Sequence, residues 1–167
     1  ESMRRSTSVV VAGVAGLAVA AGAAAQGIAA QWRVADGGNG HWYRYNTTPS
    51  TWQAAQDASV SIGGHLVTIT SPGERAFVHG LRVAADGVGQ WCWFGGYNAG
   101  PGCAWAWVTG EPFTYTNWLP GEPNCSSTLE RIASLDVDWV DLPGTYNDDR
   151  SITEWSADCN NDGIVDY

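Results

Sequence analysis

The sequence predicts an α+β domain in which two helices come first and several short strands follow. Two observations lead to this prediction. Apolar residues recur at helical spacing only before Asp86. Beyond Asp86, short aromatic and β-branched runs are separated by Gly-rich turns, which is typical of strands. The length of 167 residues suffices for one such domain with short additional segments.

Two segments carry the signals of helices. The first is predicted to open at Pro49-Ser50 and to stop at Gly63-Gly64. Between these points the apolar positions recur at helical spacing, at Trp52, Ala55, Ala58 and Ile62. The second segment begins with Ser71-Pro72-Gly73-Glu74, which has the pattern of a capping box with proline at the first helical position. Its apolar side is formed by Phe77, Val78, Leu81 and Ala84.

The other elements are predicted to be short strands rich in aromatic and β-branched residues. They cover residues 41–45, 65–70, 91–97, 103–108, 113–115, 131–135, 138–141 and 151–155. Residues 26–40 are small and polar and predict a linker or turn. Residues 116–128 predict a long irregular loop, and a loop of this length inside a compact domain usually carries function.

The first residues have the pattern of a secretory signal peptide. Arg4-Arg5 precede an apolar stretch over residues 9–21, and Ala23-Ala24-Ala25 supplies a small-residue cleavage site. We therefore assign residues 1–25 to the signal peptide, including two extra leading residues before the methionine. A transmembrane anchor is the alternative, although the apolar run is short and rich in Ala and Gly. We expect a secreted, extracellular or cell-surface-associated protein with no membrane span after cleavage.

The charge and the polar residues exclude several function classes. A formal net charge of −9 makes nucleic acid and anionic membranes poor partners, because neither finds a basic surface. The three histidines, His41, His65 and His79, share no spacing that is typical of a metal or catalytic site. No nucleophile stands beside a base in a recognisable motif. We therefore expect that the protein is not an enzyme.

Four cysteines in an exported chain predict disulfide bonds. Cys92 and Cys103 bracket a strand followed by a Gly-rich turn, and we predict a bridge between them. Cys125 and Cys159 then remain, and they either pair or stay free. No cysteine spacing resembles a zinc site.

The long loop gathers oxygen-bearing side chains. Glu122 and Asn124 lie in Gly121-Glu122-Pro123-Asn124, and Glu130 follows closely. Carboxylate and amide oxygens on an irregular segment are what a hard cation such as calcium requires. A simple surface turn is the alternative for such a composition. The position of Glu130 and the preceding Asn117-Trp118 favour the cation site.

Several short motifs occur in order between residues 40 and 156. They are residues 52–59, Gly63-Gly64-His65-Leu66-Val67-Thr68-Ile69, Glu74 and Phe77, Trp93-Phe94-Gly95-Gly96, Trp105-Ala106-Trp107-Val108-Thr109-Gly110, Asn117-Trp118 and Glu122-Pro123-Asn124. In this order and at these spacings they resemble the C-type lectin-like domain. The resemblance implies such a domain over residues 41–156. It further implies two helices, two small antiparallel sheets and a long irregular loop that holds calcium and ligand.

The resemblance also implies a set of site residues. Calcium would be held by Glu122, Asn124, Glu130 and Asp141, across a cis Glu122–Pro123 peptide bond. Glu122, Asn124 and Glu130 would also bind the vicinal hydroxyl groups of a sugar that completes the calcium shell. A Glu-Pro-Asn order implies a mannose-type preference. Most of the ten tryptophans are expected in the core rather than against sugar.

One part of the motif departs from the family pattern. Trp139-Val140-Asp141 stands in the place of a Trp-Asn-Asp triplet, and the side chain of Val140 offers no oxygen. Tyr146-Asn147-Asp148 is a second candidate for this triplet, but we prefer Asp141. A water molecule or Asn147 is then the candidate for the missing oxygen. Glu111 is expected to support the loop.

The C-terminal residues carry a second calcium pattern. Asp158, Asn160, Asp162, Ile164 and Asp166 occupy the ligand positions of a calcium loop, and its sixth position is a glycine. Residues 157–167 therefore resemble the first half of a dockerin-like or EF-hand-like repeat that is truncated before its final acid. An acidic tail is the alternative.

These observations predict a secreted module that binds a glycan through Ca²⁺. The alternative is a protein-binding or adhesion scaffold of the same fold with a degenerate calcium site, whose partner is an extracellular protein. Calcium dependence separates the two predictions.

Overall fold

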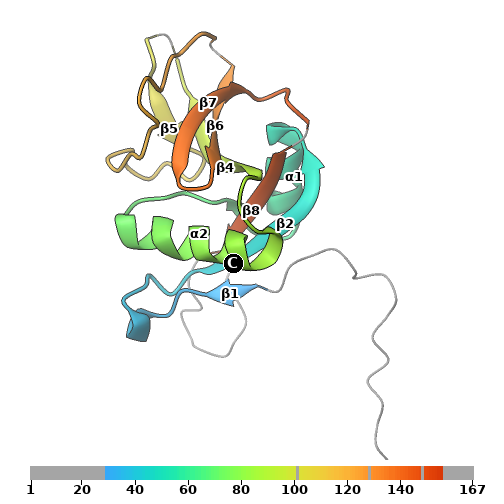
Figure 1. Ribbon diagram of the computed structural model, residues 1–167, viewed down its shortest axis with the longest axis vertical. Helices are drawn as coiled ribbons and strands as arrows, with labels where there is room; N and C mark the ends of the chain where they lie inside the picture. The colour runs from blue at the N-terminus through green and yellow to red at the C-terminus, as the bar shows by residue number, and fades with distance from the viewer. Residues whose placement is uncertain (1–28, 101, 128, 148, 156–167) are drawn as a thin grey trace, which may run out of the picture.

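A computed structural model of the protein describes residues 29–100, 102–127, 129–147 and 149–155 (Figure 1). The signal peptide predicted at residues 1–25 and the calcium motif predicted at residues 157–167 lie outside the described residues. Within the described part, the chain forms two α-helices, one short 3-10 helix and eight strands. The α+β prediction is confirmed.

All eight strands belong to one sheet with the order β1-β2-β8-β4-β6-β7, to which β3 is added beside β8 and β5 beside β4. The strands are β1 (Ala30–Gln31), β2 (Trp42–Ser50), β3 (His65–Leu66), β4 (Trp91–Asn98), β5 (Trp105–Trp107), β6 (Glu130–Leu135), β7 (Asp138–Pro143) and β8 (Asp149–Trp155). The expectation of two small antiparallel sheets is wrong in this detail. The parallel pairing of β4 with β8 joins the two halves into one mixed sheet.

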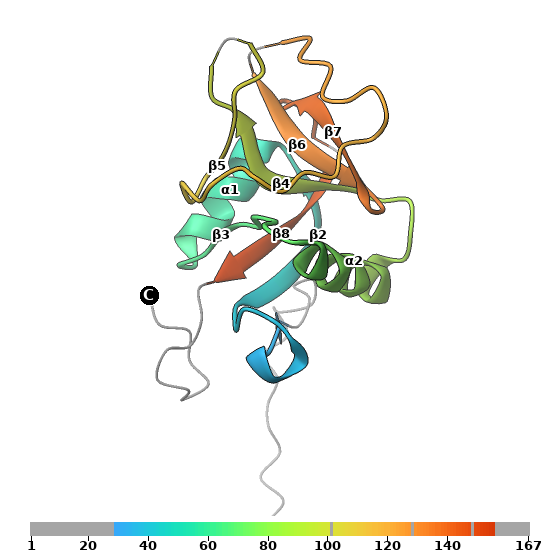
Figure 2. The same ribbon diagram turned by 90° about the vertical axis from the view of Figure 1, so that its left-hand side faces the viewer.

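The two helices lie on opposite sides of the β2–β8 pair, and the long loop gathers with β5, β6 and β7 at one end of the molecule (Figure 2). Helix α1 covers Trp52–Ser61 and begins later than predicted, because the side chain of Thr51 accepts the backbone N–H of Ala54 and caps it. Ile62, predicted as part of the apolar repeat, lies beyond the helix and is exposed.

Helix α2 covers Pro72–Asp86 and confirms the predicted start, because Ser71 Oγ accepts the N–H of Glu74 at 3.1 Å. The Glu74 carboxylate does not complete a capping box on Ser71. Its Oε2 accepts instead from the backbone N–H of Thr70 at 2.7 Å, one residue earlier.

Two predicted strands are wrong in extent or type. β3 contains only two residues, although Val67 still donates its N–H to Ile152 beyond the strand. Phe113 and Tyr115 are not in a strand, and their rings pack on Trp139. Residues 30–40, predicted as a linker or turn, contain β1 and the 3-10 helix η1 (Val34–Asp36).

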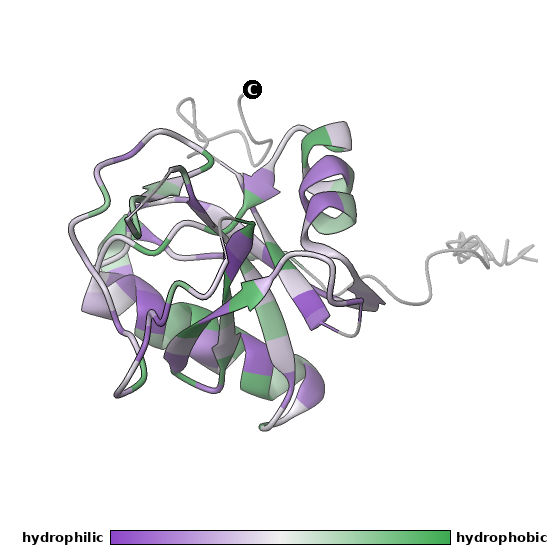
Figure 3. Cartoon of the chain, turned by 90° about the horizontal axis from the view of Figure 1, so that it is seen from above, coloured by the Kyte–Doolittle hydropathy of each residue, from purple (hydrophilic) through white to green (hydrophobic). Residues whose placement is uncertain are grey.

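The core is aromatic. Hydrophobic and hydrophilic residues are mixed along the helices and strands (Figure 3), and the central strands β4 and β8 are buried along almost their whole length. Trp139 is fully buried and lies against the rings of Phe94, Trp107, Phe113, Tyr115 and Trp118. This cluster packs the underside of the long loop, so the tryptophans serve as core, as predicted.

The disulfide prediction is wrong. Cys103 is bonded to Cys125, and Cys92 is a free, fully buried thiol. Cys92 lies on β4 with its side chain in the core, whereas Cys103 lies in the turn between β4 and β5. The turn therefore carries Cys103 to the long loop and not back to β4. Cys159 lies outside the described residues.

No helix in the described ranges has both the length and the apolar character needed to span a membrane.

Candidate functional site: a carboxylate cluster under the long loop

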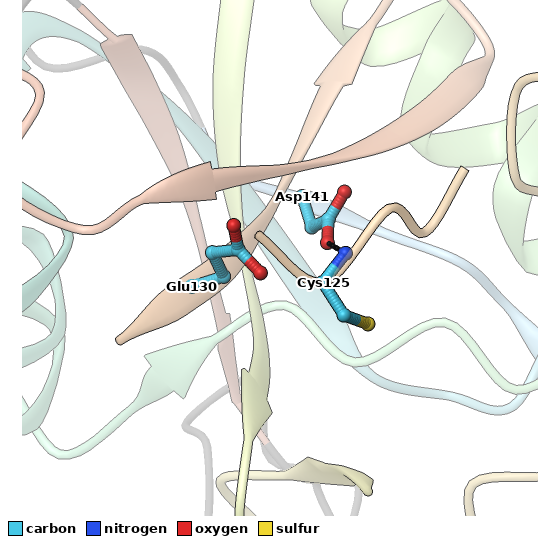
Figure 4. A group of neighbouring side chains, drawn as sticks. All are labelled: Cys125, Glu130 and Asp141. Carbon is cyan, nitrogen blue, oxygen red and sulfur yellow. Dashed lines mark hydrogen bonds between the residues drawn. The ribbon is translucent and has the colours of Figure 1, made fainter. Parts of the chain in front are cut away.

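Two adjacent strands bring two carboxylates together beneath the loop. Glu130 opens β6 and Asp141 lies in β7, where it pairs with Ile132. Because residues two apart on a strand face the same side, Glu130 and Asp141 share one face of this strand pair. Glu130 is 0% exposed and Asp141 is 3% exposed. Both carboxylates border the same small region as Cys125 of the loop, with one ligand atom of each within 4.8 Å of the others (Figure 4).

The loop is held over these strands by its backbone. The N–H groups of Asn124 and Cys125 donate to Oδ1 and Oδ2 of Asp141, at 3.0 Å and 2.7 Å. Asn124 also donates its backbone and side-chain N–H groups to Oε2 of Glu122, at 3.1 Å and 2.9 Å. The Glu122–Pro123 peptide bond is cis, as the resemblance implied.

Glu130 is only half satisfied. Ser126 Oγ donates to its Oε1 at 2.6 Å, but the buried Oε2 has no hydrogen-bond partner within the part of the chain that the structure describes. A buried carboxylate oxygen without a partner is costly, and such groups are normally paired with a charge or a metal. The group that the structure gathers here consists of Cys125 and the carboxylates of Glu130 and Asp141, and carboxylate oxygens suit a hard cation.

The acidic groups influence each other's protonation. The contact with the Asp141 carboxylate raises the pKa of Glu122 above its usual value, and burial adds to this effect. Burial opposes ionisation of Asp141, but hydrogen bonds from Glu122 and from the backbone of Asn124 and Cys125 outweigh it and lower the pKa of Asp141. The contact between the two carboxyl groups therefore disfavours the ionisation of Glu122 and favours that of Asp141.

Val140 lies on the other face of β7. Its side chain is 7% exposed and packs in a second core cluster that contains Trp52, Leu66 and Trp93. The position that lacks an oxygen therefore points into the core and away from Asp141. Asp148 of the alternative triplet lies outside the described residues.

The structure thus gathers Glu122, Asn124, Glu130 and Asp141 in one place. Glu122 and Asn124 contact each other, and Asn124 contacts Asp141. Their role as calcium ligands stays a prediction. Glu111 does not join this group: its Oε2 accepts from Thr68 Oγ1 at 2.7 Å and from Thr109 Oγ1 at 2.8 Å.

Sequence reasoning missed a second buried acidic network. Glu154 on β8 lies 2.6 Å from His41 Nδ1 and 3.9 Å from His65 Nδ1, and it accepts the Thr68 N–H at 2.8 Å. Sheet pairing creates this group, because His65 pairs with Glu154. No spacing in the sequence signals such a contact.

The neighbouring Glu74 is equally well satisfied. Its Oε1 accepts from Tyr43 and Asn39, at 2.6 Å and 3.0 Å, and its Oε2 accepts from Thr70. Every carboxylate oxygen of Glu74 and Glu154 thus has a donor or a histidine beside it, in contrast to Oε2 of Glu130. This network ties α2, β2 and β8 together.

Comparison with curated proteins identifies lectins and ice-structuring proteins. The chain is 34% identical to mouse C-type lectin domain family 4 member K over 113 residues, which is 63% of this chain and 33% of that protein. It is 30% identical to the type-2 ice-structuring protein of Hemitripterus americanus over 102 residues, or 59% of each chain. The chain thus spans a third to three-fifths of these relatives. None of these names is that of an enzyme, and no family model matches the chain.

Comparison with solved structures also identifies lectin-like and antifreeze proteins. The carbohydrate-recognition domain of cow CD23 superposes with a TM-score of 0.64 at 25% identity, covering 72% of this chain and 91% of that one. A calcium-independent type II antifreeze protein gives 0.62 at 28% identity, covering 71% and 88%. Human lithostathine gives 0.68 at 20% identity, covering 77% and 96%, which supports the fold alone. The described part of the chain therefore has the C-type lectin-like fold.

Proposed function

We propose that the chain is a secreted module that binds carbohydrate through Ca²⁺. One observation carries the proposal: the buried Oε2 of Glu130 has no partner among the described residues, and the Glu130 carboxylate lies beside that of Asp141. Calcium takes roughly six to eight oxygen ligands, and carboxylates and amides are typical donors. Two relatives are named as lectins, and the cow CD23 domain was solved in the presence of GlcNAc2Man3 oligosaccharide.

The proposed chemistry follows from the donors. Glu122, Asn124, Glu130 and Asp141 hold the ion, and two neighbouring hydroxyl groups of a sugar complete its shell. Carboxylates accept from these hydroxyl groups, whereas the amide of Asn124 donates to them. The Glu-Pro-Asn order supports a preference for mannose-type sugars. Export rests on the signal peptide at residues 1–25, and the partial motif at residues 157–167 adds a second, weak calcium loop.

Calcium titration followed by tryptophan fluorescence tests the ion site, because Trp118 lies in the loop and packs on Trp139 beneath it. We expect a saturable signal that EDTA reverses and that the Glu130→Gln variant loses. Glu111→Gln is the matched control, since Glu111 is a carboxylate outside the cluster. Retention on immobilised mannose but not galactose, reversed by EDTA, tests the sugar. Absence of any calcium effect would sink the proposal.

A calcium-independent scaffold is the second candidate. Two observations favour it: Val140 is buried in the core where the family pattern has a ligand, and one similar structure is a calcium-independent protein. In that case the loop is held by Asp141 and the Cys103–Cys125 disulfide without an ion, and the surface formed by the loop binds an extracellular protein. Glycan or protein binding that EDTA leaves unchanged would support this candidate.

A further inference from the structure

The disulfide bond ends at the carboxylate cluster. One ligand atom each of Cys125, Glu130 and Asp141 lies within 4.8 Å of the other two (Figure 4). Cys103 is bonded to Cys125, so its sulfur lies beside the same cluster. Two sulfurs and two carboxylates, from three segments that are distant in sequence, therefore meet at one place.

The oxidation state of the sulfurs decides what this group can bind. A disulfide sulfur is a poor ligand, whereas two thiolates with two carboxylates form a tetrahedral donor set for zinc, with bonds of about 2.3 Å to sulfur and about 2.0–2.2 Å to oxygen. Ligand atoms around such an ion lie about 3.3–3.8 Å apart, which follows from these bond lengths. The ligand atoms of Cys125, Glu130 and Asp141 already lie within 4.8 Å of one another.

One donor is already in place. Glu130 is 0% exposed, and its Oε2 has no partner within the described ranges. Asp141 contributes a second buried carboxylate on the neighbouring strand. Because both carboxylates are already buried, neither has to lose contact with solvent when an ion binds.

We propose that reduction of Cys103–Cys125 converts this cluster into a site for zinc-class metal ions, with Cys103, Cys125, Glu130 and Asp141 as ligands. The redox state of the loop thereby decides which metal the domain holds. The zinc-class site uses Glu130 and Asp141, which also belong to the proposed calcium site. The inference rests on the proposed function only in naming calcium as the ion that the oxidised protein binds.

The steps balance. A dithiol reductant transfers two electrons and two protons to the disulfide, so that one S–S bond breaks, two protein thiols form and the reductant becomes a disulfide. Binding of Zn²⁺ then displaces the two thiol protons to solvent and forms two Zn–S bonds. Cys103 and Cys125 are partly exposed and open to attack. Cys92 is fully buried, and burial raises the pKa of its thiol to about 12.

Cobalt(II) is the probe, because a cobalt–thiolate bond gives a charge-transfer absorption that an oxygen-only site lacks. The full chain is reduced with a phosphine, freed of metal and titrated with Co²⁺. We expect the absorption in the reduced protein, its loss on addition of Zn²⁺, and no absorption in the oxidised protein. The Cys103→Ser/Cys125→Ser variant is the control, since it keeps Cys92 and Cys159. No absorption in the reduced protein, or an equal absorption in this control, overturns the proposal.

The carboxylates are tested separately. Glu130→Gln and Asp141→Asn keep both thiols, and each should weaken cobalt binding by about tenfold or more. Unchanged affinity in both would remove the carboxylates from the site and overturn the four-ligand proposal. If reduction unfolds the domain, Zn²⁺ should restore its near-ultraviolet circular dichroism, and failure to do so counts against the site.

Calcium titration of the oxidised chain reports independently on the proposed function. A cobalt–thiolate signal with no calcium response leaves the zinc-class site standing and removes the calcium proposal. A calcium response with no cobalt–thiolate signal supports the calcium proposal and overturns the zinc-class site.

Discussion

The backbone N–H of Cys125 donates to Oδ2 of Asp141 at 2.7 Å and joins the long loop to β7. Asn124 donates to the other oxygen at 3.0 Å, so loop backbone engages the whole Asp141 carboxylate. Hydrogen bonds from N–H groups to a carboxylate are among the stronger ones in proteins. Asp141 therefore orders the loop through the protein's own hydrogen bonds, and pre-ordering reduces the entropic cost of binding.

Replacing Asp141 with Asn should loosen the loop. The amide keeps one acceptor oxygen, but its NH₂ group then faces a backbone N–H of Asn124 or Cys125. We expect a loss of about 1–3 kcal/mol in the free energy of unfolding, the penalty for a buried donor without an acceptor. Urea unfolding measures the loss. Asp138→Asn is the matched control on the same strand, and an equal loss there would contradict the special role of Asp141.

Replacing Glu130 with Gln should have opposite effects on stability and on calcium. In EDTA the variant should be more stable than the parent protein, because a buried charge with an unpartnered oxygen is removed. Calcium should raise the stability of the parent protein, because it binds the folded state, and it should leave the stability of the variant unchanged. Thermal unfolding in both solutions measures the two effects. A variant that is less stable in EDTA would show that the unpartnered Oε2 of Glu130 does not destabilise the parent protein.

Replacing Val140 with Asn should not repair the calcium site. The side chain lies in the core beside Trp52 and Trp93, so the amide would be buried without partners. We expect a loss of about 2–4 kcal/mol in the free energy of unfolding and no gain in calcium affinity. Val140→Ala separates the lost packing from the buried amide. Tighter calcium binding by the Asn variant would mean that β7 can turn this position towards the loop.

The pair of His41 and Glu154 should make stability depend on pH. The hydrogen bond to Glu154 raises the pKa of His41 above its ordinary value of 6.5, although burial opposes this. A raised pKa in the folded state means that the contribution is complete below pH 6.5 and is lost as the pH rises through the folded value. Urea unfolding between pH 6 and 9 should show this fall in the parent protein. His41→Gln should flatten it, and an unchanged slope would refute the assignment.

Local signals in the sequence predicted the helices well. Ser71-Pro72 marks the start of α2 because a cap and a helical proline act within one turn. The pattern at Phe113 and Tyr115 misled, because alternation arises whenever a segment buries every second side chain. Here these rings pack on Trp139 without strand pairing. Periodicity reports burial and does not distinguish a sheet from a packed loop.

Contacts between distant segments could not be predicted in the same way. The choice of Cys125 over Cys92 as the partner of Cys103 depends on where the turn after β4 points, which is a property of the folded sheet. Glu122, Asn124, Glu130 and Asp141 were predicted as ligands through the resemblance, and that role stays a prediction. The unpartnered state of Glu130 Oε2 depends on side-chain packing, which a sequence pattern does not contain.

The antiparallel pairing of β2 with β8 places Trp42 opposite Trp155. The first long strand of the domain thus starts beside the end of its last strand, at the pole opposite the long loop (Figure 2). β1 pairs with the start of β2, so the first and last described strand residues lie together at this pole. The carboxylate cluster of Glu130 and Asp141 therefore lies at the end of the domain away from both described ends of the chain.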